Sequence, residues 1–265
     1  MTTPATPRFD GETLDAFYHG RIRVRQGKKG YRFSVDAPLL ADFVRTREED
    51  EGLEIGTGSG IIALLLSVKP FRRITALEIQ AGLADLARRN VALNGLGGRI
   101  EVVEADFRTY EPGRRFDLVF SNPPYIGKTA GFLSASAEKS AAKHELHGAI
   151  GDFMRKTAEW LAPEGRACFI YPEKRRADLL AAAGEYGLEV RRLKFVHPRD
   201  GEPANLFLIE LGGISDANAP IVDGGTTPGG AKALAGGEAE IMPPLVLFGP
   251  DGKYTEDAEA VFAGP

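Results

Sequence analysis

Apolar and polar positions along the chain form short apolar runs that alternate with longer segments. The short runs have the length and composition of buried strands. They lie at residues 52–55, 73–77, 100–104, 116–121, 166–171, 188–196 and 205–211. The longer segments predict helices at residues 59–68, 80–94, 149–161 and 174–184. This alternation predicts an α/β fold in which seven strands form a mostly parallel, doubly wound sheet.

The last two predicted strands are joined by a short connection that runs only from Pro198 to Ala204. A crossover helix needs about a dozen residues or more, so this connection cannot hold one. We therefore expect the two strands to pair antiparallel and to form a C-terminal hairpin of the sheet. Ligands of such sheets bind beyond the carboxyl ends of the parallel strands, and the glycine turn, the two acidic strand ends and the Asn-Pro-Pro-Tyr segment described below all fall there.

The N-terminal part of the chain has a different pattern. Residues 1–13 are expected to be flexible. Within residues 14–45, basic and apolar residues alternate from Arg21 to Arg25 and predict a strand. A turn at residues 26–30 then leads to a second predicted strand at residues 31–33, so this segment is expected to form a hairpin.

The remaining boundaries follow from composition. Residues 36–44 predict a short helix with a proline in its first turn. Residues 46–211 carry the strand–helix alternation and form the main domain. Residues 212–240 contain eight glycines, six alanines and no aromatic residue, which predicts a flexible insert. Residues 241–265 predict a strand and a helix that complete the same domain.

A glycine-rich turn follows the first predicted strand of the main domain. It consists of Glu54 and then Gly56, Thr57, Gly58, Ser59 and Gly60. Glycines at alternate positions allow positive φ angles and a close approach of a ligand to the backbone. Ser59 is a candidate N-cap for the following helix, whose free N–H groups would face the ligand. The spacing is not the Gly-x-Gly-x-x-Gly of dinucleotide folds, so a pyrophosphate is not the expected ligand.

Acidic residues follow the next two predicted strands. Glu78, with Ile79 after it, ends the second strand, and an acid at this place commonly binds ribose hydroxyls. Asp106 and Phe107 follow the third strand. The carboxylate of Asp106 could accept a hydrogen bond from an adenine amino group, with Phe107 beside the ring. Three such turns in succession predict a site for a nucleoside.

The segment Asn122-Pro123-Pro124-Tyr125 ends the fourth predicted strand. Two prolines cannot continue a strand ladder, and they hold the backbone extended and stiff. The side-chain oxygen of Asn122 and the carbonyl oxygen of Pro123 can accept two N–H bonds, and Tyr125 can stack on a ring. This combination suits a flat group that carries an NH2.

Composition and charge exclude several classes of protein. The chain has 265 residues, 43% hydrophobic and 26% charged, as in ordinary globular enzymes, and no run is long and apolar enough for a membrane span. The single cysteine, Cys168, allows no internal disulfide and fits a reducing cytoplasm. His144 and His147 lack the spacing of a zinc-binding pair, so no metal is expected.

The net charge of −4 comes mostly from residues 212–240, which hold four acids and one lysine. Between residues 21 and 32 the charges are all positive. The basic residues of this segment are Arg21, Arg23, Arg25, Lys28, Lys29 and Arg32. Such a segment is a candidate surface for a phosphate backbone.

The order of these motifs resembles that of class I S-adenosylmethionine-dependent methyltransferases, and an Asn-Pro-Pro-Tyr segment marks those that methylate planar nitrogens. More closely, the chain resembles the bacterial family of tRNA1(Val) (adenine-N6)-methyltransferases. The similar segments are residues 31–40, 54–60, 76–79, 116–125, 142–145 and 245–255. The long insert before the C-terminal strand departs from that family.

The resemblance implies a class I methyltransferase fold, S-adenosylmethionine as the methyl donor and tRNA as the partner. The implied acceptor is N6 of the adenine on the 3′ side of the anticodon. It assigns the residues from Asn122 to Tyr125 to the acceptor base. The donor residues would be Glu54, Gly56, Thr57, Gly58, Ser59, Gly60, Glu78, Ile79, Asp106, Phe107 and Asn122.

Other substrates remain open from the sequence. The amide of a release-factor glutamine and N2 of a guanine in ribosomal RNA are also planar nitrogens. Enzymes that act on release factors usually carry a larger helical domain before the glycine turn, which only about fifty residues precede here. A non-catalytic RNA-binding module is the alternative of another class. The sequence leaves the oligomeric state undetermined.

Overall fold

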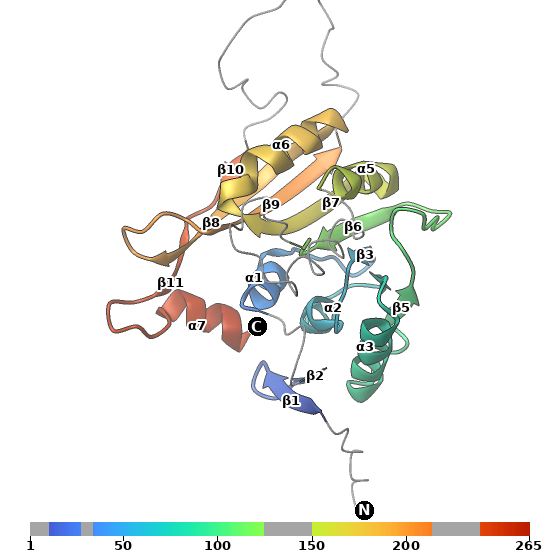
Figure 1. The fold of residues 1–265 in the computed structure, drawn as a ribbon, viewed down its shortest axis with the longest axis horizontal. Helices are drawn as coiled ribbons and strands as arrows, with labels where there is room; N and C mark the ends of the chain where they lie inside the picture. Colours follow the sequence, from blue (N-terminus) through green and yellow to red (C-terminus); the bar gives the residue numbers. More distant parts are fainter. Residues whose placement is uncertain (1–10, 28–33, 125–149, 214–238) are drawn as a thin grey trace, which may run out of the picture.

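The computed structural model describes residues 11–27, 34–124, 150–213 and 239–265. Its centre is a mixed sheet in the order β10-β8-β9-β7-β6-β3-β4-β5, with β11 paired to β8. Helices α5 and α6 cover one face of this sheet, and α1, α2 and α3 lie on the other (Figure 1). The predicted doubly wound α/β fold is therefore confirmed.

Four parallel strands form one half of the sheet. They are β3 (Glu51–Ile55), β4 (Arg73–Glu78), β5 (Ile100–Glu104) and β6 (Phe116–Ser121). The central residues of β6, from Leu118 to Phe120, are fully buried, as expected for a strand with helices on both faces. All four begin and end within about one residue of the predicted bounds.

The other half contains β7 (Leu161–Pro172), β8 (Leu188–Arg199) and β9 (Leu206–Gly213). β7 is parallel to β6, whereas β9 is antiparallel to both β7 and β8. The antiparallel pairing predicted from the short connection is confirmed. Two short strands, β10 (Glu240–Ile241) and β11 (Leu245–Phe248), extend the predicted seven by pairing parallel with β8.

The helices complete two apolar cores, one on each face of the sheet. One core includes residues of α1 (Asp36–Phe43), α2 (Ile61–Leu66), α3 (Ala81–Leu93) and α7 (Glu256–Ala263). The other includes residues of α5 (Ile150–Trp160) and α6 (Arg176–Glu185), and the 3-10 turn η1 (Glu173–Arg175) precedes α6. All the predicted helices are present, with ends shifted by a few residues.

The N-terminal hairpin differs from the prediction. It is formed by β1 (Glu12–Phe17) and β2 (Ile22–Gly27), joined by a turn in which Tyr18 and His19 have φ angles of 52° and 55°. The basic strand was expected to pair with residues 31–33, which lie outside the described residues. β1 was not predicted because it is only partly buried, so its sequence lacks the clear alternation that marks β2. Glu12 and Thr13 consequently belong to a strand and not to a flexible terminus.

Candidate functional site

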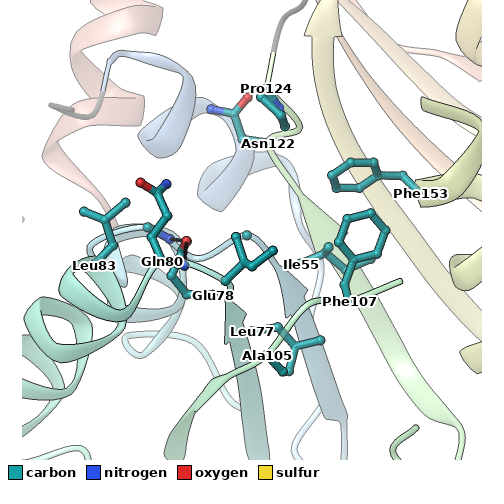
Figure 2. A pocket seen from close by; sticks show the side chains of 13 residues that line it. Ile55, Leu77, Glu78, Gln80, Leu83, Ala105, Phe107, Asn122, Pro124 and Phe153 are labelled. Atoms are coloured by element: carbon teal, nitrogen blue, oxygen red, sulfur yellow. Dashed lines mark hydrogen bonds between the residues drawn. The ribbon is translucent and has the colours of Figure 1, made fainter. Parts of the chain in front are cut away.

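A pocket lies over the carboxyl ends of β3, β4, β5 and β6. Apolar side chains form most of its wall, and polar groups stand at a few positions (Figure 2). Its lining residues are Ile55, Gly56, Gly58, Leu77, Glu78, Ile79, Gln80, Leu83, Ala105, Phe107, Asn122, Pro124 and Phe153. A mostly apolar hollow with a few placed polar groups is the usual form of a small-molecule site.

The glycine turn has the backbone conformation that its sequence predicts. Gly56, Gly58 and Gly60 have φ angles of 74°, 58° and 85°, which residues with a side chain rarely adopt. The backbone N–H groups of Gly56 and Thr57 both donate to the carbonyl of Leu77, at 2.9 and 2.8 Å. The end of β4 therefore fixes the beginning of the turn.

The predicted N-cap is wrong. Helix α2 begins at Ile61, and its N-cap position is Gly60, which has no side chain to cap the helix. The Ser59 hydroxyl is buried and has no hydrogen-bond partner among the described residues. The reason is the positive φ of Gly60, which delays the start of the helix by one residue.

Glu78 is the acidic residue of the pocket. It is 5% exposed, and each of its carboxylate oxygens accepts one backbone N–H: Oε2 from Gly58 at 2.8 Å and Oε1 from Gln80 at 2.9 Å. A carboxylate has about four acceptor positions, so two remain for a ligand. The same side chain can thus hold the glycine turn and accept hydrogen bonds from the two hydroxyls of a ribose.

Glu54 lies in β3 beneath the glycine turn and does not line the pocket. It is fully buried, and its Oε2 accepts a hydrogen bond from the Thr57 hydroxyl at 2.6 Å. Burial raises the pKa of Glu54 to about 8, and the nearby Glu78 adds to the rise, while hydrogen bonds from Thr57 and the Ala63 amide oppose it. Glu54 is therefore mostly protonated at neutral pH, and its hydrogen bond with Thr57 stabilises the glycine turn on the side away from the pocket.

The third strand end contributes Phe107 and not Asp106. Phe107 lines the pocket beside Phe153 of α5, with the two ring centroids 4.4 Å apart. The carboxylate of Asp106 instead binds the guanidinium of Arg108 through both oxygens, at 2.6 to 3.0 Å. Phe153 was missed in the sequence, since an aromatic residue on an amphipathic helix is more often a core residue. Leu83, near the start of α3, was missed because an apolar helix residue is likewise more often a core residue, and no feature of the sequence marked Gln80.

Asn122 and Pro124 follow β6 and face the pocket across from Glu78 (Figure 2). The Ser121 hydroxyl donates to the Ile55 carbonyl at 2.6 Å, which ties the end of β6 to the end of β3 and fixes where the prolines begin. Pro123 is buried and is not a lining residue. Tyr125 lies outside the described residues.

The arginines in and directly before β2 have partners within the fold. Arg21 donates to the carbonyl of the terminal Pro265 at 2.7 Å, and Arg23 to that of Leu93 at 3.4 Å. Arg25 is 8% exposed and lies 3.9 Å from Glu12 of the paired strand. Of the predicted RNA-binding residues, Arg21 and Arg23 are exposed, whereas Lys28, Lys29 and Arg32 lie outside the described residues.

Residues 11–27, 34–124, 150–213 and 239–265 contain neither a membrane-spanning helix nor a metal-binding cluster. None of the helices there is both long and apolar enough to cross a bilayer. No three acidic, histidine or cysteine side chains come together there in a way that could hold a metal ion.

Comparison with known proteins agrees with this geometry. Residues 32–178 match the methyltransferase small domain family. The tRNA1(Val) (adenine(37)-N6)-methyltransferase of Flavobacteriaceae bacterium strain 3519-10 is 34% identical over 60% of this chain and 67% of its own length. The protein of the same name from Phocaeicola vulgatus is 32% identical over 72% and 78% of the two chains.

A solved structure supports the fold. A predicted O-methyltransferase from Agrobacterium tumefaciens superposes with a TM-score of 0.60 over 85% of this chain and 94% of its own, at 21% identity. Similarity at this level concerns the fold alone. The family match and the sequence similarity over most of two named relatives show the family as well as the fold. This chain belongs to the methyltransferase small domain family and, within it, to the family of the tRNA1(Val) (adenine(37)-N6)-methyltransferases.

Proposed function

We propose that this protein transfers the methyl group of S-adenosylmethionine to the exocyclic N6 of an adenine in tRNA, the one on the 3′ side of the anticodon. The observation that carries the proposal is the meeting of two groups of residues at one pocket. Glu78 and the glycine turn stand on one side of it, and Asn122 and Pro124 stand on the other. The relatives named above carry the same activity in their names. Such an enzyme would work in the cytoplasm, where tRNA is modified.

The donor side of the pocket fits a nucleoside. Glu78 keeps acceptor positions for the ribose hydroxyls after binding Gly58 and Gln80. Phe107 and Leu83 provide apolar surface for a purine ring. A Cβ placed on Gly56 would have no atom within 4 Å, so the backbone borders open space where the rest of the donor would lie.

The acceptor side fits a flat amine. S-adenosylmethionine supplies an electrophilic methyl group, and the amine nitrogen must approach it in line. An adenine amine is a weak nucleophile because its lone pair is delocalised into the ring. The Asn122 side-chain oxygen and the Pro123 carbonyl would each accept a hydrogen bond from one N–H of this amine. These bonds would orient the lone pair and increase the electron density on nitrogen. Orientation of this kind can supply roughly 7–11 kcal/mol of the barrier reduction.

No strong base is needed for this chemistry. The nitrogen becomes acidic once it carries the methyl group, so its proton can leave to water after the transfer. The pocket agrees with this order of events, since its only ionisable lining side chain among the described residues is Glu78, which is held by two backbone N–H groups.

An adenine must leave its base stack to reach the pocket. That step costs a few kcal/mol in a duplex and least in a single-stranded loop. Stacking on an aromatic side chain returns about 1–3 kcal/mol, a role that we assign to Tyr125. The free-energy cost of unstacking is therefore small for an adenine in the single-stranded anticodon loop.

The test is methyl transfer in vitro. Purified protein is given S-adenosylmethionine with a labelled methyl group and, separately, total tRNA, ribosomal RNA or release factor. We expect label in tRNA alone, as N6-methyladenosine when the nucleosides are analysed by mass spectrometry. Label in release factor or as N2-methylguanosine, or no label in any tRNA, would refute the proposal.

A further inference from the structure

Strand β2 lies along helix α3, and two asparagines hold it there. Asn90 accepts from the N–H of Arg25 at 2.8 Å and donates to the carbonyl of the same residue at 2.9 Å. Asn94 accepts from the N–H of Arg23 at 2.9 Å and donates to its carbonyl at 2.7 Å. The spacing of the two asparagines matches that of the two arginines, because four residues along a helix rise about 6 Å and two residues along a strand rise about 6.6 Å. The two amides therefore act as a neighbouring strand for the hairpin.

Asn90 also reaches the donor site. Its side-chain nitrogen makes a second hydrogen bond, to the carbonyl of Ser59 at 2.9 Å, and the residue is fully buried. Ser59 is the residue between Gly58, whose N–H is held by Glu78, and Gly60. One side chain therefore joins the N-terminal hairpin to the glycine turn. Asn94 holds the hairpin in the same way, but its remaining bond goes to the carbonyl of Asn90.

The glycine turn depends on this contact because few other groups hold its second half. The first half is fixed by the two bonds to Leu77. In the second half the Gly60 N–H donates to the Thr57 carbonyl at 2.9 Å within the turn, and the Ser59 hydroxyl has no partner among the described residues. The bond from Asn90 is the contact that ties this peptide to α3. The turn also packs closely on α3, since a Cβ on Gly60 would lie 3.4 Å from the Cβ of Ala87.

We propose that Asn90 is a positioning residue for the methyl donor: it holds the glycine turn in its binding shape through the Ser59 carbonyl, and it couples that shape to the docked hairpin. This inference rests on the proposed function, in that the pocket must bind S-adenosylmethionine. It gives the N-terminal hairpin a role in donor binding that is separate from any contact with RNA.

The experiment compares Asn90→Ala with Asn94→Ala. Both variants lose the two bonds to β2, but only Asn90→Ala loses the bond to Ser59. Calorimetry with S-adenosylmethionine should show donor affinity reduced about fivefold in Asn90→Ala, the change expected for one hydrogen bond of ordinary net strength. Affinity in Asn94→Ala should stay within about twofold of the parent. In steady-state assays Asn90→Ala should raise the KM for the donor and leave the KM for tRNA unchanged.

Two results would overturn the inference: unchanged donor affinity in folded Asn90→Ala, or an equal loss in both variants. If Asn90→Ala does not fold, hydrogen exchange in the unaltered protein decides. Donor binding should then slow exchange of the Arg25 amide, held by Asn90, more than that of Arg23, held by Asn94. Equal or absent slowing would contradict the coupling. Because donor binding is measured without tRNA, failure here is distinct from failure to methylate tRNA.

Discussion

Replacing Glu78 by glutamine tests the donor side of the pocket most directly. The side chain keeps its size and loses its charge. Both carboxylate oxygens accept backbone N–H groups, from Gly58 and from Gln80, and an amide has only one oxygen. In Glu78→Gln one of these N–H groups must therefore face an NH2 group, and the ribose hydroxyls lose a charged acceptor.

The magnitude follows from these contacts. A hydrogen bond to a charged group contributes about 1.5–3 kcal/mol, and every 1.4 kcal/mol is about a tenfold change in affinity. Losing one such bond in the bound state should weaken S-adenosylmethionine binding by about 10- to 150-fold. Calorimetry with the donor measures this directly.

Glu104→Gln is the matched control. Glu104 is the residue of β5 paired with Glu78 in the sheet, but its side chain is 47% exposed and lies 3.8 Å from Arg88. Its neutralisation should leave donor affinity within about twofold, since Glu104 does not line the pocket and its exposed pair with Arg88 is weak. If Glu78→Gln binds the donor as tightly as Glu104→Gln does, Glu78 is not the ribose acceptor.

Three further changes test other parts of the site. Asn122→Ala should lower kcat for tRNA methylation on the order of 100-fold, as when one well-placed polar group is removed from an active site, with little change in donor affinity; full activity would remove Asn122 from the mechanism. In the unaltered protein, burial raises the pKa of Glu54 from 4.5 to about 8. The stabilisation of the folded state by the protonated side chain is therefore fully present below pH 4.5 and is lost as pH rises from 4.5 to about 8. Denaturant unfolding should show the free energy of unfolding falling in that window by up to about 1.4 kcal/mol per pH unit relative to Glu54→Gln, whereas parallel profiles would contradict a neutral Glu54. Gly60→Ala should cost about 1–3 kcal/mol of stability because φ is 85° and Ala87 is close; Gly82→Ala, in α3 with open space around it, should not destabilise, and equal unfolding midpoints for the two would refute the strain.

The sheet could be predicted because its strands are buried on both faces. A run such as that from Leu118 to Phe120 is apolar at every position. The connection before β9 is too short for a crossover helix, so only antiparallel pairing of β8 and β9 was possible. β1 could not be predicted in this way. Its side chains are only partly buried, so hydrophobic patterning did not mark residues 12–17 as a strand.

The site was predictable where a strand end alone determines position. The glycine turn, Glu78, Phe107 and Asn122 all follow parallel strands and all meet at the pocket. The prediction was less accurate where the direction of a side chain matters. Glu54 points beneath the turn, and Asp106 turns to Arg108, although both lie at or near strand ends. The sequence specifies the backbone position here, and packing decides which way the side chain points.

The charge of the N-terminal hairpin shows why a segment cannot be judged without its structural neighbours. Counted along the chain, residues 21–32 are purely basic. In the fold, Glu12 of the paired strand lies beside Arg25 and accepts two hydrogen bonds from Arg89 of α3, at 2.8 and 3.0 Å. Glu12 therefore offsets part of the positive charge of the hairpin and also docks the hairpin on α3.

That docking changes what an RNA-binding experiment on the hairpin can reveal. Arg21 and Arg23 are exposed, and reversing their charge tests phosphate contact, which should reduce the salt dependence of tRNA binding. Arg25 is buried against α3 next to Asn90, so its replacement would disturb the hairpin and, through Ser59, the donor turn. A loss of activity in an Arg25 variant would thus carry no information about RNA unless donor affinity were measured in the same protein.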